Sequence, residues 1–156
     1  RRFTFQRWHS FDSPLWQRIW TEAKETPPPD VLPILQASDR DAGAIQMTRE
    51  NAERAGVAEN IEFTCRAVSA VEPPAVPGWV VTNPPYGVRA SADKDLRNLY
   101  AQIGHVLRAH CPGWRTAILS GSVTLLRHTG IPTEATLALI NGGMGVHLAL
   151  GHVPHP

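Results

Sequence analysis

Residues 80–87 read Val-Val-Thr-Asn-Pro-Pro-Tyr-Gly, and they place an apolar strand directly before a stiff turn. Proline has a fixed φ and no N–H, so a strand that begins at Trp79 must end at the two prolines. The turn then holds an amide, two carbonyl groups and an aromatic ring at the carboxyl end of a strand, where open α/β sheets bind ligands. The Asn83 side chain and a neighbouring carbonyl can accept hydrogen bonds from one exocyclic amino group, and Tyr86 can stack on the ring carrying that group.

The same four residues are also typical of a rigid surface turn, because Asn and Pro are ordinary turn residues. The flanking sequence favours a functional loop instead. Trp79-Val80-Val81 predicts a buried strand before the turn, and the apolar periodicity of residues 95–109 predicts an amphipathic helix after it. A loop between a strand and a helix is where α/β enzymes carry their chemistry.

The other segments alternate between the two kinds of element. We expect further helices at 13–25, after the Ser38-Asp39-Arg40-Asp41 stretch up to Ala55, and at 123–128. We expect further strands at 31–37, 61–66, 115–120, 133–140 and 146–152. Ser13 is the expected N-cap of the first helix. The inner face of the second helix is expected to carry Ala42, Ile45, Ala52 and Ala55. This order predicts one α/β domain over residues 1–156, with a mostly parallel sheet. Asn141-Gly142-Gly143 predicts an antiparallel hairpin at its edge.

The composition narrows the class of protein. A chain of 156 residues fits one domain, and no stretch approaches the ~18 apolar residues of a membrane span. Cys65, Cys111 and the seven scattered histidines show no metal-binding spacing. We therefore expect a reduced, cytoplasmic protein with no metal site and no membrane partner. The net charge of +1 gives no electrostatic argument for nucleic acid.

Asp39 is the second residue of interest, because it stands where a strand ends and a helix begins. An acid in this place accepts hydrogen bonds from the two hydroxyls of a ribose in dinucleotide-binding folds. Asp39 is equally explained as the N-cap of the following helix, with Asp41 supporting its first turn. The presence of a second strand that ends in Asn-Pro-Pro-Tyr favours the ribose interpretation.

Taken together, these motifs resemble those of the class I, S-adenosylmethionine-dependent RNA methyltransferases. The chain is most similar to the THUMP-associated guanine-N2 methyltransferases, a UPF0020-like group with a Rossmann-like sheet. The similar segments cover nearly the whole chain: residues 5–16, 38–63, 80–89, 95–100 and 112–114.

The resemblance implies a role for each matching position. The cofactor would be S-adenosylmethionine, with its ribose at Asp39 and its adenine beside Arg40 and the backbone N–H of Val68. Asn83 and the Pro84 carbonyl, in the turn that includes Pro85, would hold the target amino group beside the cofactor. Tyr86 would stack on the flipped base, Gly87 would let the loop pass close to the substrate, and Arg89 would contact phosphate. The implied partner is ribosomal or transfer RNA, methylated most often at guanine N2.

Two departures from the family pattern stand out. Ala67 occupies the position where the family usually has an Asp that binds the adenine amino group. No glycine occurs before Gly43, although the family carries a Gly-rich loop and a central strand upstream of the residue matching Asp39. We therefore expect the C-terminal part of a catalytic domain, without its first strand. Such a chain would bind the cofactor weakly and would expose two strand edges, which favour different pairing, self-association or marginal stability.

Three alternatives stay open at this point. Adenine-N6 methyltransferases and protein glutamine methyltransferases also use Asn-Pro-Pro-Tyr. A non-catalytic remnant that serves as a binding module would also explain Ala67 and the missing glycine loop.

Overall fold

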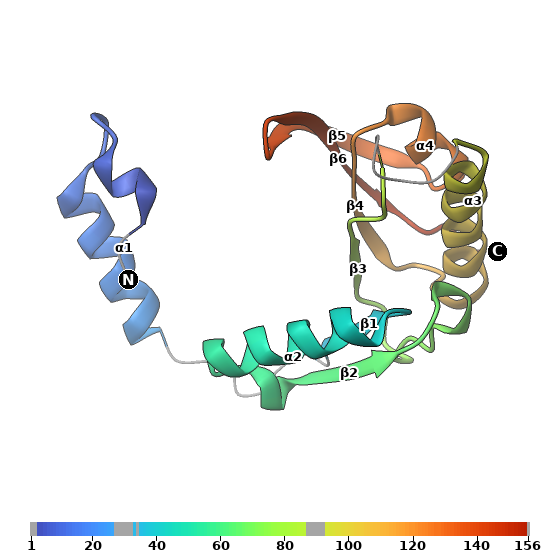
Figure 1. Cartoon of the computed structure of the whole chain (residues 1–156), viewed down its shortest axis with the longest axis horizontal. Helices are drawn as coiled ribbons and strands as arrows, with labels where there is room; N and C mark the ends of the chain where they lie inside the picture. The colour runs from blue at the N-terminus through green and yellow to red at the C-terminus, as the bar shows by residue number, and fades with distance from the viewer. Residues whose placement is uncertain (1–2, 27–32, 34, 87–92, 156) are drawn as a thin grey trace. The chain divides into compact units, whose positions relative to one another are not determined.

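The computed structural model describes residues 3–26, 33, 35–86 and 93–155, and the chain divides into two compact units, Arg1–Pro33 and Ile34–Pro156. Their elements follow in chain order (Figure 1): η1 (Thr4–Arg7), α1 (Ser13–Glu25), β1 (Leu35–Asp39), α2 (Ala42–Ala55), η2 (Ala58–Asn60), β2 (Ile61–Cys65), η3 (Val68–Ala70), β3 (Trp79–Thr82), α3 (Asp93–His110), β4 (Arg115–Ser120), α4 (Val123–His128), β5 (Thr133–Asn141) and β6 (Met144–His152). The alternation of helices and strands confirms the predicted α/β class.

The first unit is a short helical segment that is held together by aromatic rings. Trp16 of α1 packs edge-on against Phe5, with ring centroids 5.1 Å apart, and its centroid lies 5.6 Å from that of Trp20. The predicted bounds of α1 are confirmed, but the predicted N-cap is wrong. Asp12, not Ser13, is the N-cap, and its carboxylate accepts a hydrogen bond of 2.8 Å from the Leu15 N–H. An acceptor one residue before the first helical position reaches this free N–H, whereas Ser13 already lies within the helix.

In the second unit, β1 and β2 form a parallel two-stranded sheet, with Leu35 opposite Ile61 and Asp39 opposite Cys65. The strand expected at 31–37 ends two residues later than predicted, and its predicted start falls outside the described residues. The helix α2 ends at Gly56, which has a φ of 74° and is the expected C-cap.

The predicted inner face of α2 is only partly buried. Ala52 is buried and Ile45 is half-buried, but Ala42 and Ala55 are exposed. A sheet of two strands is narrow, so it covers only part of the apolar stripe of a helix that lies on it.

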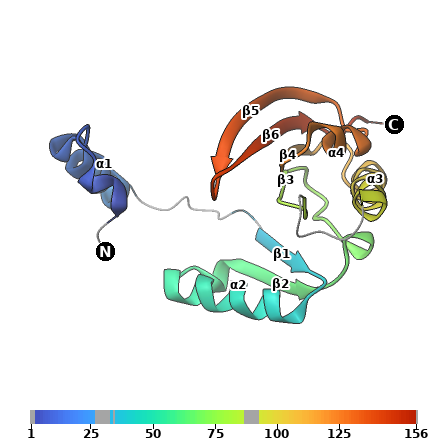
Figure 2. The ribbon, with the colours of Figure 1, turned by 45° about the horizontal axis from the view of Figure 1, so that its top comes forward.

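The larger sheet has the strand order β3-β4-β6-β5, in which β3 and β4 are parallel and the β5–β6 hairpin is antiparallel. Gly142 and Gly143 have φ values of 58° and 82°, as a tight two-residue hairpin turn requires. Figure 2 shows the hairpin as a long curved ribbon, whose strand β6 pairs with β4. The predicted antiparallel edge is therefore confirmed.

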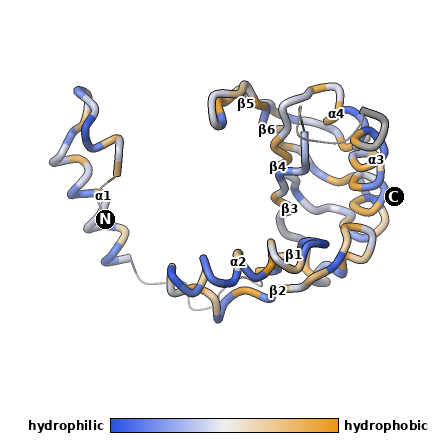
Figure 3. Tube along the Cα trace, viewed as in Figure 1, coloured by the Kyte–Doolittle hydropathy of each residue, from blue (hydrophilic) through white to orange (hydrophobic). Residues whose placement is uncertain are grey.

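The helices α3 and α4 cover one face of this larger sheet. Tyr100 and Leu96 of α3 pack with Leu125 and Leu126 of α4 against Ile118 of β4. Along α3, hydrophobic and hydrophilic residues alternate as the predicted amphipathic helix requires (Figure 3). A second cluster of buried residues joins the end of α3 to the end of β6: Ile103, Leu107, Cys111, Ile131 and Val153.

One feature differs from the single sheet that we expected. Among the described strands, β1 pairs with β2 alone and β3 pairs with β4 alone, so the parallel strands belong to two separate sheets. Apolar side chains on these strands are exposed: Leu35 by 47%, Trp79 by 52% and Val81 by 76%. The prediction of a buried strand at residues 79–81 is therefore wrong.

Candidate functional site

The Asn-Pro-Pro-Tyr turn begins directly after β3, as predicted. Pro84 is buried, whereas the side chains of Asn83 and Pro85 are exposed. Because β3 and β4 are parallel, their carboxyl ends lie at the same edge of the sheet. The sequence thus places a rigid turn at this edge, anchored by one proline and presenting an amide to solvent.

Tyr86 completes the turn, and its ring is half-buried against the core formed by α3, α4 and β4. A Cβ atom added to Gly121 would lie 2.7 Å from Tyr86 Cδ2, so the ring passes directly over this glycine. The side-chain amide of Asn141 donates a hydrogen bond of 3.4 Å to the Tyr86 hydroxyl. Sequence reasoning missed both neighbours. The available signals were a Gly directly after the strand at 115–120 and the Asn that opens the hairpin turn.

Asp39 is the last residue of β1, and its carboxylate accepts a hydrogen bond of 2.8 Å from the Asp41 N–H. The N-cap of α2 is Asp41, which accepts from the N–H groups of Gly43 and Ala44 at 2.7 and 3.4 Å. Asp39 as the N-cap is therefore wrong, because Asp41 caps the helix, and the ribose role of Asp39 stays a prediction. Asp39 itself is exposed at the carboxyl end of its strand.

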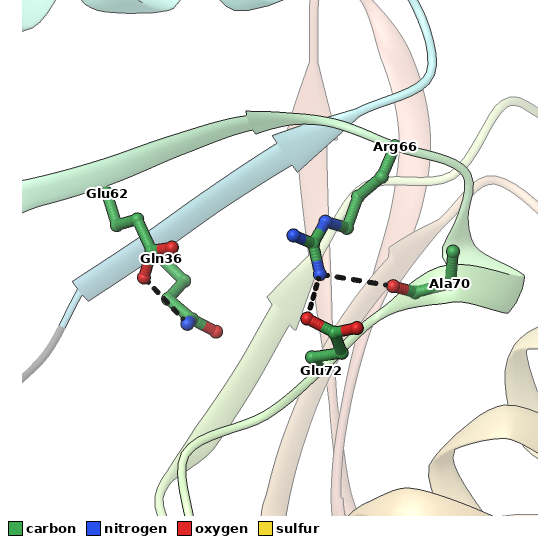
Figure 4. A network of polar contacts seen from close by, with 5 residues as sticks. All are labelled: Gln36, Glu62, Arg66, Ala70 and Glu72. Atoms are coloured by element: carbon green, nitrogen blue, oxygen red, sulfur yellow. Dashed lines mark hydrogen bonds and ion pairs between the residues drawn. The ribbon is translucent and has the colours of Figure 1, made fainter.

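The segment after β2 is braced by Arg66 (Figure 4). Its guanidinium contacts the Glu72 carboxylate at 3.0 Å and donates to the Ala70 carbonyl oxygen at 3.2 Å. Ala67 precedes the short helix η3, and the Val68 side chain packs against the cluster at the end of α3. This segment is held in place from both sides, so the Val68 backbone is fixed near the carboxyl end of β2.

On the neighbouring strands, the side chain of Gln36 donates to the Glu62 carboxylate at 2.9 Å (Figure 4). These two residues face each other in the register of β1 and β2. The contact ties the two strands together on the sheet that ends in Asp39.

The remaining predicted positions are distributed as follows. Arg40 is exposed beside Asp39, and its carbonyl oxygen accepts a hydrogen bond from the Cys65 thiol at 3.6 Å. Gly87 and Arg89 lie outside the described residues. Asp39 and Asn83 lie at the ends of strands in two different sheets, so the expected cofactor-binding and substrate-binding residues belong to different sheets.

No group of three or more His, Cys, Asp or Glu side chains among the described residues has a geometry that would hold a metal ion. No helix in the described part of the chain is long and apolar enough to cross a membrane.

Comparison with known proteins shows the family of the chain. Residues 2–148 match the family described as UPF0020, RMKL-like, methyltransferase domain. The ribosomal RNA large subunit methyltransferase K/L of Shewanella sp. strain W3-18-1 is 34% identical over 146 residues, which cover 92% of this chain and 21% of that protein. A putative RNA methyltransferase of Synechocystis sp. strain PCC 6803 is 34% identical over 142 residues, which cover 91% of this chain and 37% of that protein.

Solved structures show the same fold. A possible methylase from Clostridium difficile 630 superposes with a TM-score of 0.77 at 26% identity, over 100% of this chain and 41% of that one. A putative methyltransferase complexed with SAH superposes with a TM-score of 0.79 at 24% identity, with the same coverage. The chain thus spans 21% and 37% of the two curated relatives and 41% of these two structures.

Proposed function

The chain belongs to the UPF0020 family of S-adenosylmethionine-dependent methyltransferases, and on that premise we propose that it carries the substrate half of an RNA base methyltransferase site. The proposed target is an exocyclic amino group, and guanine N2 is the leading candidate. One observation supports this assignment above the others. An exposed Asn83 follows a parallel strand, and the half-buried ring of Tyr86 lies at the same turn.

The proposed chemistry follows from the properties of an aromatic amine. Its nitrogen is a poor nucleophile, because the lone pair is delocalised into the ring. Asn83 Oδ1 and the Pro84 carbonyl oxygen would accept its two N–H bonds, which favours a more tetrahedral nitrogen and directs the lone pair outwards. Tyr86 would hold the base by stacking after the base has left its own stack, at a cost of a few kcal/mol. S-adenosylmethionine supplies an electrophilic methyl group when bound, so positioning by these residues would provide much of the rate.

The residues on β1 and β2 fit one side of this cofactor. Asp39 presents an exposed carboxylate at a strand end, with its helix capped by Asp41, which suits the two hydroxyls of a ribose. The backbone N–H of Val68 would contact the adenine ring, and Arg40 would lie beside it. Ala67 offers no carboxylate to the adenine amino group, and no glycine precedes Gly43. We expect the 156-residue chain alone to bind S-adenosylmethionine weakly, and a micromolar dissociation constant by calorimetry would contradict this.

The proposed substrate class comes from the relatives. Both curated relatives have RNA in their names, and one is named for ribosomal RNA of the large subunit. We propose RNA as the partner of the whole protein, with ribosomal RNA ahead of transfer RNA. Adenine N6 and a protein glutamine side chain are the alternative acceptors, because a planar amide or amine would make the same contacts with Asn83. A non-catalytic binding module is the third alternative.

Nucleoside analysis separates these possibilities. Purified full-length protein is incubated with unmodified RNA and labelled cofactor, and the digested RNA is examined by mass spectrometry. We expect N2-methylguanosine, and Asn83→Ala is expected to lower its formation by about 10²-fold or more, as loss of a preorganised polar contact does elsewhere. Asn60→Ala is the matched control, because Asn60 is an exposed amide in η2, away from the turn. Unchanged methylation in Asn83→Ala would refute the mechanism. N6-methyladenosine as the product would show that the target base is adenine and not guanine.

We also propose self-association of the isolated chain through its open strand edges. The side chains of Trp79 and Val81 on β3 are 52% and 76% exposed, and β3 pairs with β4 alone among the described strands. Unpaired edges of this kind accept strands from other chains. Light scattering at two protein concentrations tests this, and a monomer at both would contradict it.

A further inference from the structure

The surroundings of Tyr86 point beyond the residues that the family pattern assigns. Three separate parts of the chain meet at its ring: the core beneath α3 and α4, the backbone at Gly121, and the side chain of Asn141. The ring is therefore in contact at its body, at one edge and at its hydroxyl.

The sheet topology explains why these parts meet. Gly121 directly follows β4, which is parallel to β3, so it lies at the edge of the sheet where the turn with Tyr86 begins. The strand β5 is antiparallel to β6, which is antiparallel to β4, and β5 therefore runs in the same direction as β4. Asn141 is the last residue of β5 and reaches the same edge.

We propose that Gly121 and Asn141 are positioning residues that set the orientation of the Tyr86 ring and thereby the space into which the target base enters. This inference rests on the proposed function, because it assumes that Tyr86 stacks on the base. Neither residue is assigned a chemical step.

Gly121 acts through the absence of a side chain. A Cβ atom there would lie 2.7 Å from Tyr86 Cδ2 and 3.2 Å from Cε2, and contacts below 3.0 Å require something to move. The ring atoms approached in this way are rigid, and the ring also packs against the core. Even alanine must therefore tilt or displace the ring.

Asn141 acts through its amide, which donates to the Tyr86 hydroxyl at 3.4 Å. Asn is also a common residue of tight hairpin turns, so its identity alone does not distinguish a positioning role from a turn role. The two roles differ in whether the effects of substitutions at Asn141 and Tyr86 are coupled. In a positioning role, substitution of Asn141 no longer changes kcat/KM when the Tyr86 hydroxyl is absent.

The first test measures methylation by the full-length protein and its Gly121→Ala, Asn141→Leu and Gly145→Ala variants. Gly145→Ala is the matched control, because a Cβ atom there meets nothing within 4 Å and its φ lies outside the left-handed region. We expect Gly121→Ala to lower kcat/KM for RNA by about 10–10²-fold, as small misplacements of substrate do. Asn141→Leu should lower it a few-fold, as loss of one hydrogen bond does. KM for S-adenosylmethionine should stay near the wild-type value in all three variants.

A double-mutant cycle tests the coupling. Tyr86→Phe removes the hydroxyl, and Asn141→Leu should then have no further effect on kcat/KM for RNA. Full additivity of the two changes, or a Gly121→Ala enzyme that equals Gly145→Ala, would overturn the inference while leaving the proposed function intact.

A spectroscopic measurement is independent of activity. With 3-fluorotyrosine placed at position 86, Gly121→Ala and Asn141→Leu should both shift the ¹⁹F resonance, and Gly145→Ala should leave it unmoved. Unmoved resonances in the first two variants would overturn the inference even if the protein were inactive. A wild-type protein that methylates no RNA but shows these shifts would instead refute the proposed function and retain the positioning of the ring.

Discussion

Replacement of Gly104 by alanine gives a sharp test of how α3 and α4 pack. Glycine within a helix normally destabilises a protein, and alanine at such a site gains about 1 kcal/mol. Here the sign should reverse. A Cβ atom at position 104 would lie 1.7 Å from the Thr129 carbonyl oxygen and 2.5 Å from its carbon. That carbonyl must move, and it currently accepts a hydrogen bond from the Arg108 guanidinium at 2.6 Å.

The size of the effect follows from these contacts. Overpacking a close contact costs about 1–3 kcal/mol, and loss of a hydrogen bond to a charged group costs about 1.5–3 kcal/mol. After subtraction of the helix-propensity gain of about 1 kcal/mol, Gly104→Ala should lower the free energy of unfolding by about 1.5–5 kcal/mol. Urea denaturation followed by circular dichroism at 222 nm measures this loss.

A control on the same helix fixes the ordinary scale of such changes. Ala101 is exposed on α3, and Ala101→Gly should cost about 1 kcal/mol through helix propensity alone. An unfolding midpoint of Gly104→Ala at or above that of the wild-type chain would refute the close approach of α3 to the end of α4. A variant that fails to fold without urea would agree with it.

Three further predictions concern buried hydroxyls and thiols. Ser120→Ala should lower the free energy of unfolding by about 1–3 kcal/mol, because it removes the acceptor, at 2.9 Å, of the fully buried Tyr100 hydroxyl. Tyr100→Phe should lower it by only ~1 kcal/mol, because the Ser120 hydroxyl keeps its hydrogen bonds with Ser122. Equal urea midpoints would contradict this. Burial raises the pKa of the Cys111 thiol, and burial also raises the pKa of the Tyr100 phenol, although the hydrogen bond between Tyr100 and Ser120 acts in the opposite direction. The contribution of each group to the free energy of unfolding is therefore fully present below its pKa in the unfolded chain, about 8.5 for the thiol and about 10 for the phenol. This contribution is lost as the pH rises through the higher pKa of the folded chain. A flat urea midpoint between about pH 8 and 11 would be inconsistent with that. Ellman's reagent should modify exposed Cys65 in the folded chain and buried Cys111 only after unfolding.

Much of the fold was predictable because its signals are local. The strand Arg115–Ser120 and the helix Val123–His128 were predicted with the bounds that the structure shows. The Gly142-Gly143 pair predicted the hairpin, since glycine adopts the two consecutive positive φ values of such a turn without strain. The place of Asn83 was predictable for the same reason, because two prolines end a strand wherever they occur.

The contacts that shape the site were not predictable in this way. The hydrogen bond between Asn141 and Tyr86 joins residues 55 positions apart, and no periodicity reports such a distance in sequence. Gly121 has no chemistry of its own, so a search for reactive side chains passes over it. Asp12 was missed as N-cap because Ser13-Pro14 looked like a complete helix start, although an acid one position earlier served better.

The distribution of buried residues explains why the proposed substrate half of the site is held more firmly than the proposed cofactor half. Among the described residues, every buried apolar side chain except those of Ala52 and Pro84 lies between Leu96 and Val153. The turn with Asn83 and Tyr86 is anchored on this core, whereas Asp39 stands on two strands and one helix that bury little. Since burial of apolar surface is what holds a loop in one geometry, the turn keeps its shape within this chain. The carboxylate of Asp39 needs further contacts to be held at a fixed distance from this turn.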